Sequence, residues 1–485
     1  MKKMMSWVLA ATLVCGASVF TSCSNDNSDN SGSIEQAKNN RKEFIQHTRA
    51  TLKDLAENMN FTSWNAANTM NLRFNQHVLN NPEFEKAVLA TFIQKTQQSI
   101  KPVEEGSELA EMGFYSYGTV DLTDFNYRFT MKADNTGFDV EPAEDFEVVL
   151  NGWNPATQQL GYGIYKLILK SDGDKGFKFV HASRHQLGTA FVVVMPSKFQ
   201  FSISANFNGQ WDEAFSGSFK NQVSVAEGHE YAEIKRDSWS VSGTLRTSLP
   251  GVAEVGFKTD ETKLDFSIVS DHVNNKSDIV LSWIQNDRKM VDLELKDSGD
   301  GVSKIFDMSQ FTSSSSILDV IGAIMTSRTL DEGKLTLLDD LTTTISISDM
   351  QKAVELARES AAARRSYADR ETIDQYTQQL NELVKAEITC KGVNQEIPMR
   401  LMTTKFGVDW WTMPSFNFAD ENGYVSFVDL LDAQSVAYGI NIIDHAAAPM
   451  QQSMIVVRQL LQYVQGLVSG FQQQNKNEKN ERMKE

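Results

Sequence analysis

The chain has 485 residues, of which 41% are hydrophobic, and its 63 acidic and 46 basic residues give a formal net charge of −17 at pH 7. This acidic excess argues against nucleic acid as a partner, because affinity for phosphates comes from clustered Lys and Arg. The length is ample for a hydrophobic core and permits up to three domains.

The amino terminus has the pattern of an export signal. Lys2 and Lys3 precede an apolar stretch at residues 7–20 that is too short to span a bilayer comfortably. The stretch runs into Phe20-Thr21-Ser22-Cys23. This segment resembles the signal peptide of bacterial lipoproteins, whose lipobox sets small residues before a cysteine, although Phe20 stands where leucine is usual. The resemblance implies that residues 1–22 are removed and that Cys23 carries the lipid.

The residues that follow Cys23 have the composition of a flexible tether. Residues 24–33 contain no apolar side chain, so they cannot bury the surface that an ordered structure requires. We expect residues 23–35 to join the folded body to the membrane, where each buried CH₂ of an acyl chain such as palmitate contributes about 0.8 kcal/mol. The tract also resembles the export tract of Bacteroidota surface lipoproteins, although Asp26 and Asp29 are not adjacent. This implies an anchor in the outer membrane, with the body at the cell surface or on the periplasmic face.

The three cysteines allow no disulfide within the mature chain. Cys15 leaves with the signal peptide, Cys23 receives the lipid, and Cys390 remains alone. We interpret Cys390 as a small buried apolar residue rather than a nucleophile, because no Cys-x-x-Cys motif accompanies it. Loss of residues 1–22 removes two lysines and no acid, so the net charge of −17 becomes −19.

Two helices are expected first in the folded body. In the first, the residues that share one face recur at spacings of three and four: Ile45, Thr48, Leu52, Leu55 and Met59. A second helix is predicted to begin at Pro82, with Phe84, Val88 and Phe92 on its buried face. We interpret both stripes as core faces and not as binding surfaces.

From about Asp145 the apolar period changes to two, which predicts a series of strands. Alternation is clearest at Phe199, Phe201, Ile203, Ala205 and Phe207, and it returns at Leu264, Phe266 and Ile268. Strands with one apolar face are typical of antiparallel sheets. One short echo links Phe201-Ser-Ile-Ser with Phe266-Ser-Ile-Val, and it hints at two related meanders.

After Gly301 the pattern predicts helices again. The segment 348–390 is expected to be helical with Ser348 or Asp349 as its N-cap, a short strand is expected at 397–406, and a long helix is expected to begin near Pro449. We therefore predict an α+β fold, in which a large antiparallel β-sheet (a meander) is flanked by N-terminal and C-terminal helices. The expected division is a β-rich region with N-terminal helices at 36–300, a mainly helical region at 301–470 that packs on the sheet, and a polar tail at 471–485.

The sequence contains no recognisable catalytic, cofactor-binding or metal-binding motif. His181 and His185 lie four residues apart, but no third ligand accompanies them. We therefore predict no catalytic residue, no cofactor and no metal site, and we lean towards a protein that is not an enzyme.

Aromatic residues in turn-like contexts give the one functional hint. Trp153, Trp410 and Trp411 are candidates for a flat ligand platform, and the alternative is that they belong to the core. The leading hypothesis is a ligand-binding or accessory lipoprotein whose partner is a glycan, a lipid or another protein. Two alternatives stay open: an envelope hydrolase without a short motif, and a lipid carrier with an aromatic-lined sheet.

Overall fold

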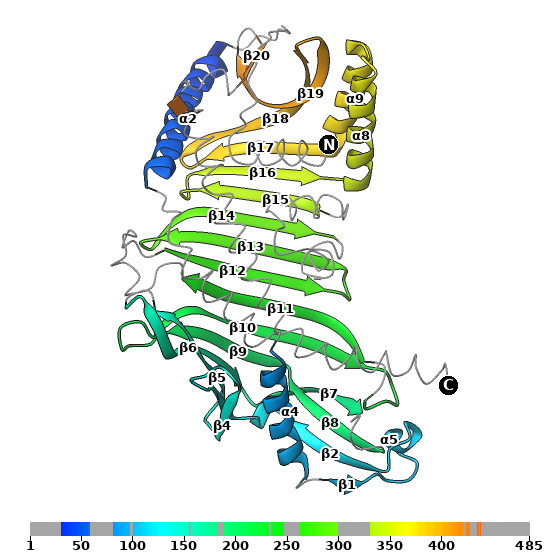
Figure 1. The fold of residues 1–485 in the computed structure, drawn as a ribbon. Helices are drawn as coiled ribbons and strands as arrows, with labels where there is room; N and C mark the ends of the chain where they lie inside the picture. The colour runs from blue at the N-terminus through cyan, green and yellow to red at the C-terminus, as the bar shows by residue number, and fades with distance from the viewer. Residues whose placement is uncertain are drawn as a thin grey trace. The chain divides into compact units, whose positions relative to one another are not determined.

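The computed structural model describes most of the chain between residues 31 and 437. The described residues are 31–58, 81–97, 100–154, 157–182, 188–231, 234–246, 262–298, 330–420, 423–426, 434–435 and 437. The chain has an α+β fold with a large, mostly antiparallel meander (Figure 1). It divides into two compact units: unit 1 is Met1–Phe61 with Asn275–Gln452, and unit 2 is Thr62–Asn274 with Ser453–Glu485. The internal boundary therefore falls at residue 275, earlier than the one expected near Gly301.

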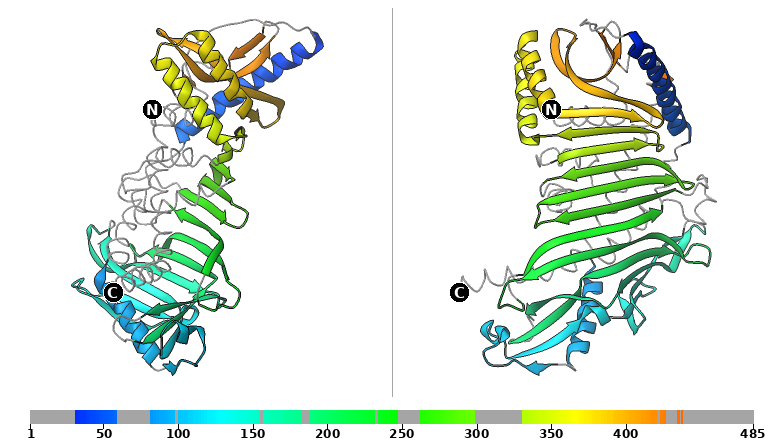
Figure 2. Two further views of the ribbon diagram at one scale, coloured as in Figure 1. Left: turned by 90° about the vertical axis from the view of Figure 1, so that its right-hand side faces the viewer. Right: turned by 180° about the vertical axis from the view of Figure 1, so that it is seen from behind.

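Unit 1 is an antiparallel meander with helices at both ends of its strands. Its elements are α2 (Ser31–Asn58), β13 (Lys276–Gln285), β14 (Arg288–Asp297), β15 (Leu330–Leu337), β16 (Leu341–Ile347), α8 (Met350–Arg365), α9 (Arg370–Leu383), β17 (Val384–Cys390), β18 (Val393–Phe406), β19 (Asp409–Asp420) and β20 (Gly423–Ser426). Strands β13 to β20 are neighbours in chain order. In Figures 1 and 2, α2 lies at the end of the strands opposite to α8 and α9.

The strands of unit 1 bury one face, as their alternation predicts. Leu335 of β15 is paired with Thr343 of β16, which is paired with Ile388 of β17, and all three are buried. The next pair along β15 and β16 is polar, and the hydroxyls of Thr336 and Thr342 lie 3.1 Å apart. A slip of one residue in any strand would expose its apolar set, so the register is fixed by burial.

The segment expected to be one helix over 348–390 is two helices and a strand. Asp349 is the N-cap of α8, and its side chain accepts a hydrogen bond from the backbone N–H of Lys352, as predicted. The helical expectation is wrong after Leu383, because residues 384–390 form β17. Residues 386, 388 and 390 are buried in alternation, and this period of two overrides the helix propensity of the preceding residues.

Other boundaries also differ from those expected. The described part of 301–470 is not mainly helical, since it contains β15 to β20 beside α8 and α9. Helix α2 begins at Ser31, so the last five residues of the predicted tether at 23–35 are helical. Cys23, the signal peptide, the helix expected near Pro449 and the tail at 471–485 lie outside the described residues. None of the described helices is long and apolar enough to cross a membrane.

Unit 2 contains two sheets. Its elements are α4 (Pro82–Gln97), β1 (Lys101–Pro102), α5 (Glu108–Glu111), β2 (Ser116–Asp121), η3 (Leu122–Asp124), β3 (Tyr127–Met131), β4 (Phe138–Pro142), β5 (Phe146–Asn154), β6 (Gln159–Ser171), β7 (Lys175–Ala182), β8 (Thr189–Pro196), β9 (Lys198–Ala205), β10 (Asp212–Val225), β11 (Ile234–Arg246) and β12 (Thr262–Asp271). The larger sheet has the order β12-β11-β10-β9-β6-β5-β3-β4, and the smaller has the order β1-β2-β8-β7. Strand structure thus begins well before Asp145, where it was expected.

Helix α4 begins at Pro82, as predicted, and carries aromatic residues into the core of unit 2. The ring of Phe84 lies 5.6 Å from that of Phe129 and 5.1 Å from that of Phe138, both in edge-to-face geometry. Such pairs contribute about 0.5–1.5 kcal/mol beyond the burial of their area. The predicted stripe on this helix is therefore a core face.

The echo between residues 201 and 266 has a structural reason. Gly217 of β10 faces Gly243 of β11, and these glycines are paired with Phe201 of β9 and Phe266 of β12 respectively. A Cβ atom on Gly217 would lie 2.6 Å from the Cζ atom of Phe201, and one on Gly243 would lie 3.0 Å from that of Phe266. The two phenylalanines therefore occupy the space that the glycines leave, one on each side of the pair.

Substitution of Gly217 by Ala is expected to destabilise unit 2 by about 1–3 kcal/mol, because the new methyl group would also lie 2.3 Å from the backbone oxygen of Ser242. The measurement is the shift in the midpoint of thermal unfolding. Gly137→Ala is the matched control, since a Cβ at Gly137 meets nothing within 4 Å. Equal midpoints for the two variants would contradict the packing described.

Candidate functional site

The hairpin formed by β5 and β6 in unit 2 exposes three large apolar side chains. Trp153 is 46% exposed, and its partner across the hairpin, Leu160, is 48% exposed. Tyr162, which is 65% exposed, comes two residues after Leu160 on the same strand. Directly paired residues share a face of a sheet, so Trp153 and Leu160 lie together, and Tyr162 is exposed next to this pair along β6. We call this surface the hairpin face.

The backbone beneath the hairpin face is held by a buried tyrosine. The hydroxyl of Tyr165 donates a hydrogen bond to the carbonyl oxygen of Trp153 at 2.9 Å, and the Tyr165 side chain is fully buried. The pairing shifts register between Leu150 and Gly152, which marks a β-bulge. A Cβ atom on Gly152 would lie 2.3 Å from the ring of Tyr165, so only glycine fits there.

Buried amides fix the hairpin further. The Asn151 side chain donates to the carbonyl oxygen of Lys132 at 2.9 Å and accepts from the backbone N–H of Gly163 at 2.9 Å. The Asn154 side chain donates to the carbonyl oxygen of Phe207 at 3.1 Å. These bonds connect the hairpin to neighbouring segments of unit 2. The backbone that carries the exposed rings is therefore held in place.

The other two predicted platform residues, Trp410 and Trp411, belong to unit 1 and are half-buried on β19. The guanidinium carbon of Arg364 lies 3.6 Å from the centroid of the Trp411 ring. The Trp410 ring is approached by Arg370 at 5.4 Å and by Lys405 at 5.6 Å. Cation–π contacts of this kind occupy ring faces that a ligand would need. Of the three predicted tryptophans, Trp153 therefore has the most accessible ring.

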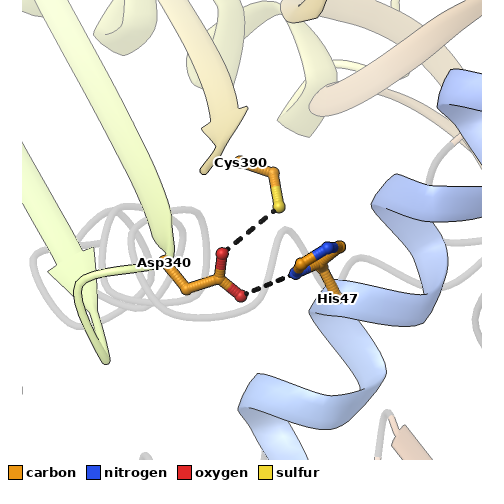
Figure 3. Close-up of side chains that lie close together, drawn as sticks. All are labelled: His47, Asp340 and Cys390. Carbon is orange, nitrogen blue, oxygen red and sulfur yellow. Dashed lines mark hydrogen bonds and ion pairs between the residues drawn. The ribbon is translucent and has the colours of Figure 1, made fainter. Parts of the chain in front are cut away.

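A second cluster, in unit 1, joins three segments that are distant in the sequence (Figure 3). His47 of α2 lies with its Nδ1 atom 3.0 Å from Oδ2 of Asp340, in the turn between β15 and β16. Cys390, the last residue of β17, donates its S–H to Oδ1 of the same carboxylate at 3.5 Å. Thr51, one turn of α2 beyond His47, donates its hydroxyl to Oδ2 at 3.1 Å.

The Asp340 carboxylate is placed by a turn that L-residues rarely adopt. Leu338 has φ of +54° and Asp339 has φ of +53°, which is the left-handed region at both central positions. The N–H of Leu338 donates to the carbonyl oxygen of Met290, and the N–H of Lys391 donates to that of Asp340. The turn is thereby fixed to the β13–β14 hairpin on one side and to the end of β17 on the other.

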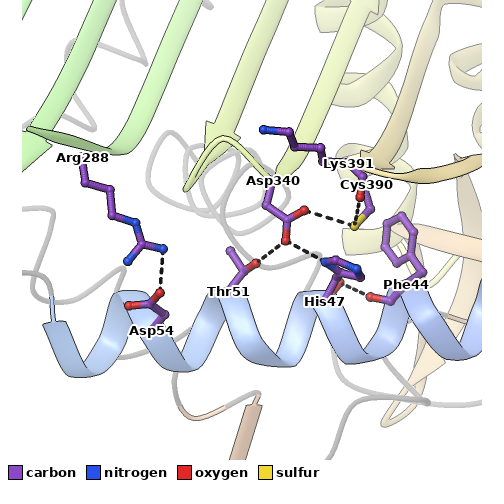
Figure 4. A network of polar contacts seen from close by, with 9 residues as sticks. Phe44, His47, Thr51, Asp54, Arg288, Asp340, Cys390 and Lys391 are labelled. Atoms are coloured by element: carbon purple, nitrogen blue, oxygen red, sulfur yellow. Dashed lines mark hydrogen bonds and ion pairs between the residues drawn. The ribbon is translucent and has the colours of Figure 1, made fainter.

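Beyond the β15–β16 turn, helix α2 also contacts the β13–β14 hairpin (Figure 4). Asp54 accepts a hydrogen bond from Arg288 at 2.7 Å, and this bond lowers the pKa of Asp54 below its usual range. At the end of the helix, the side chain of Gln285 donates to the carbonyl oxygen of Asn58 at 2.8 Å. The polar edge of α2 is thus bonded to two neighbouring hairpins.

The cluster does not form a thiol hydrolase site. Burial raises the pKa of the Cys390 thiol to about 12, and the negative charge of Asp340 contributes in the same direction. In a thiol hydrolase the imidazole stands between the thiol and the carboxylate, whereas here the carboxylate of Asp340 stands between Cys390 and His47. The thiol is therefore protonated at neutral pH, and its hydrogen-bond partner is a carboxylate and not an imidazole.

Comparison of the chain with family models, with characterised proteins and with solved structures finds no match. The sequence indicates Trp153 as a candidate, which stays a prediction, but not the cluster around Asp340, because the members of the cluster come from α2, a turn and the end of a strand. The one available signal was the alternation of Ile388 and Cys390, which predicts a shared buried face.

The burial and raised pKa of Cys390 predict slow alkylation. At pH 8, iodoacetamide should modify Cys390 at least about 100-fold more slowly in the folded protein than in urea, as followed by mass spectrometry of its peptide. Asp340→Asn should raise the folded rate, because it removes a negative charge that disfavours the thiolate, while Asp54→Asn should leave it nearly unchanged. Equal rates in the folded and unfolded protein would show an accessible thiolate and contradict this description.

Proposed function

We propose that this protein is a lipid-anchored envelope protein that binds a neutral glycan on the hairpin face. The observation that carries the proposal is the joint exposure of the paired Trp153 and Leu160, with the exposed Tyr162 two residues further along β6, on a hairpin that buried groups hold in place. Large apolar side chains gathered on a surface are typical of a binding site.

The chemistry of the hairpin face suits a sugar ring. The flat side of an indole or phenol ring can cover the C–H groups of a pyranose, while the ring edges and hydroxyl remain available to water and polar groups. The exposed side chain of Gln159, at the tip of the hairpin, offers an amide to sugar hydroxyls. A fixed support lowers the ordering cost of binding. The net charge of −17 favours a neutral over an anionic glycan.

The two alternatives have less support among the described residues. A lipid carrier needs an apolar strand face that is open to solvent, but in unit 2 the aromatic row of Phe201, Phe215 and Phe266 is buried. A hydrolase that used Cys390 would need a thiolate, and burial keeps this thiol protonated. Glycan binding therefore remains the preferred proposal.

The membrane anchor has a direct test. We expect Cys23→Ser, expressed in an envelope-containing bacterium, to move the protein from the membrane fraction to the soluble fraction, because stable attachment requires the acyl chains. Ser22→Ala is the control, since a small residue remains before the cysteine. Retention of the Cys23→Ser variant in membranes would contradict lipid attachment.

The glycan proposal is tested by affinity electrophoresis of the full chain in gels that contain cellulose-type β-glucan, xylan, mannan or starch. We expect retardation by at least one polysaccharide. Trp153→Ala should weaken it about tenfold, which corresponds to about 1.4 kcal/mol of lost stacking and burial. Trp153→Phe should retain part of the affinity.

Tyr115→Ala is the matched control, because Tyr115 is 80% exposed, belongs to the same unit and lies outside the hairpin. It should migrate like the unmodified protein. Absence of retardation by all four polysaccharides, or equal retardation of the Trp153→Ala variant, would overturn the proposal.

A further inference from the structure

The cluster in unit 1 brings together three different kinds of metal ligand. His47, Asp340 and Cys390 each offer one atom, and these nitrogen, oxygen and sulfur atoms all lie within 4.8 Å of one another. A zinc ion is bound at about 2.0 Å by nitrogen or oxygen and at about 2.3 Å by sulfur, so its ligand atoms lie about 3.3–3.8 Å apart. Side-chain adjustments of about 1 Å would bring the three atoms to that spacing.

We propose that His47, Asp340 and Cys390 form a binding site for a zinc-class divalent ion in unit 1. Imidazole and thiolate select borderline and soft transition metals, whereas calcium and magnesium require sites built of oxygen. This inference is independent of the glycan proposal, because the hairpin face belongs to unit 2 and shares no residue with the cluster.

The proton balance of binding is simple. The Cys390 S–H releases one proton to solvent, and the resulting thiolate bonds to the ion with no change of oxidation state. The Asp340 oxygen that accepted this S–H then faces the cation instead. Without the ion, Nδ1 of His47 carries the hydrogen that faces Oδ2 of Asp340. On binding, Nδ1 gives up this proton to solvent and Nε2 takes one up, so the neutral ring binds the ion through Nδ1 and releases no net proton. The hydrogen bond from the thiol to Asp340 thus belongs to the form without metal, and the positive charge of the ion would stabilise the thiolate.

Groups around the cluster suit this role. The hydroxyl of Thr51 donates to Oδ2 of Asp340 at 3.1 Å and so orients the carboxylate, as outer partners do in metal sites. Cys390 is only 4% exposed, whereas the side chain of His47 is 45% exposed. The ion would enter from the side of His47 and keep a water molecule there as its fourth ligand. Figure 4 shows the Lys391 side chain directed away from the thiol.

The bound ion would fasten α2 to the sheet of unit 1. His47 lies on α2, Asp340 in the β15–β16 turn and Cys390 at the end of β17, so coordination would cross-link three elements. Helix α2 already buries Phe44, Leu52 and Leu55, whereas its ion pairs between exposed side chains contribute little. Metal coordination would add stability whenever the ion is present.

The test measures binding of Zn²⁺ alone to the purified full chain by isothermal titration calorimetry, and it then records the absorption spectrum of the protein loaded with Co²⁺. We expect a Zn²⁺ site whose affinity falls at least tenfold in His47→Gln, Asp340→Asn and Cys390→Ser. The cobalt-loaded protein should show a thiolate charge-transfer band that Cys390→Ser abolishes. Cys15 and Cys23 are unchanged in every variant.

His229→Gln is the matched control. The Nδ1 atom of His229 lies 3.1 Å from a carboxylate oxygen of Glu108, which repeats the pairing of His47 with Asp340 without a cysteine. This variant should bind Zn²⁺ as the unmodified chain does. If Cys390→Ser fails to fold, His47→Gln still tests the site, because the side chain of His47 is exposed. Absence of Zn²⁺ binding, unchanged affinity in His47→Gln, or a cobalt spectrum without the thiolate band would each overturn the proposal.

Discussion

Burial of one face of each antiparallel strand is the constraint on which the rest of this structure depends. In unit 1 it sets Leu335 beside Thr343 and Thr343 beside Ile388, and a shift of one residue would expose a whole apolar row. With the register fixed, the position of every hairpin turn is fixed as well. The turn that carries Asp340 therefore meets the end of β17 at Cys390, and His47 of α2 bonds to the same carboxylate.

Both candidate sites lie where the alternation ends or is interrupted. The hairpin face follows a β-bulge at Leu150, beyond which Trp153 turns outward while Tyr165 fills the core beneath it. The metal-ligand cluster lies at the ends of β15, β16 and β17, where a buried thiol meets a carboxylate and an imidazole. A regular strand needs neither arrangement, since its exposed positions are polar and its buried positions are apolar. At these two places, the stability of the sheet does not by itself explain why these residue types are present.

Local patterns in the sequence predicted the elements that local forces determine. Pro82 begins α4 and Asp349 caps α8, because a fixed φ angle and an N-terminal hydrogen bond are properties of short segments. The period of two around Phe201 and Phe266 predicted β9 and β12 for the same reason. The sequence predicts a helix for residues 384–390, which form strand β17. The strand is short, and the residues before it have a helical composition, so the sequence pattern extends the helix too far.

Contacts between segments that are distant in the chain could not be predicted from the sequence. His47 and Asp340 are 293 residues apart, and no periodic pattern indicates that the middle of α2 lies beside the β15–β16 turn. The three tryptophans had the same turn-like context, yet Arg364 stacks on Trp411 while the ring of Trp153 is exposed. Only tertiary packing separates these cases, because the guanidinium comes from a helix more than 40 residues away along the chain.

We propose that a ligand binds at the hairpin face of unit 2. Hydroxyl-radical footprinting of the full chain, with and without the polysaccharide that retards it most, tests this claim without any mutation. We predict protection of Trp153, Leu160 and Tyr162, while Tyr115 and Tyr367, which are more exposed in the free protein, keep their reactivity. Protection of those two tyrosines with no change at Trp153 would contradict the account.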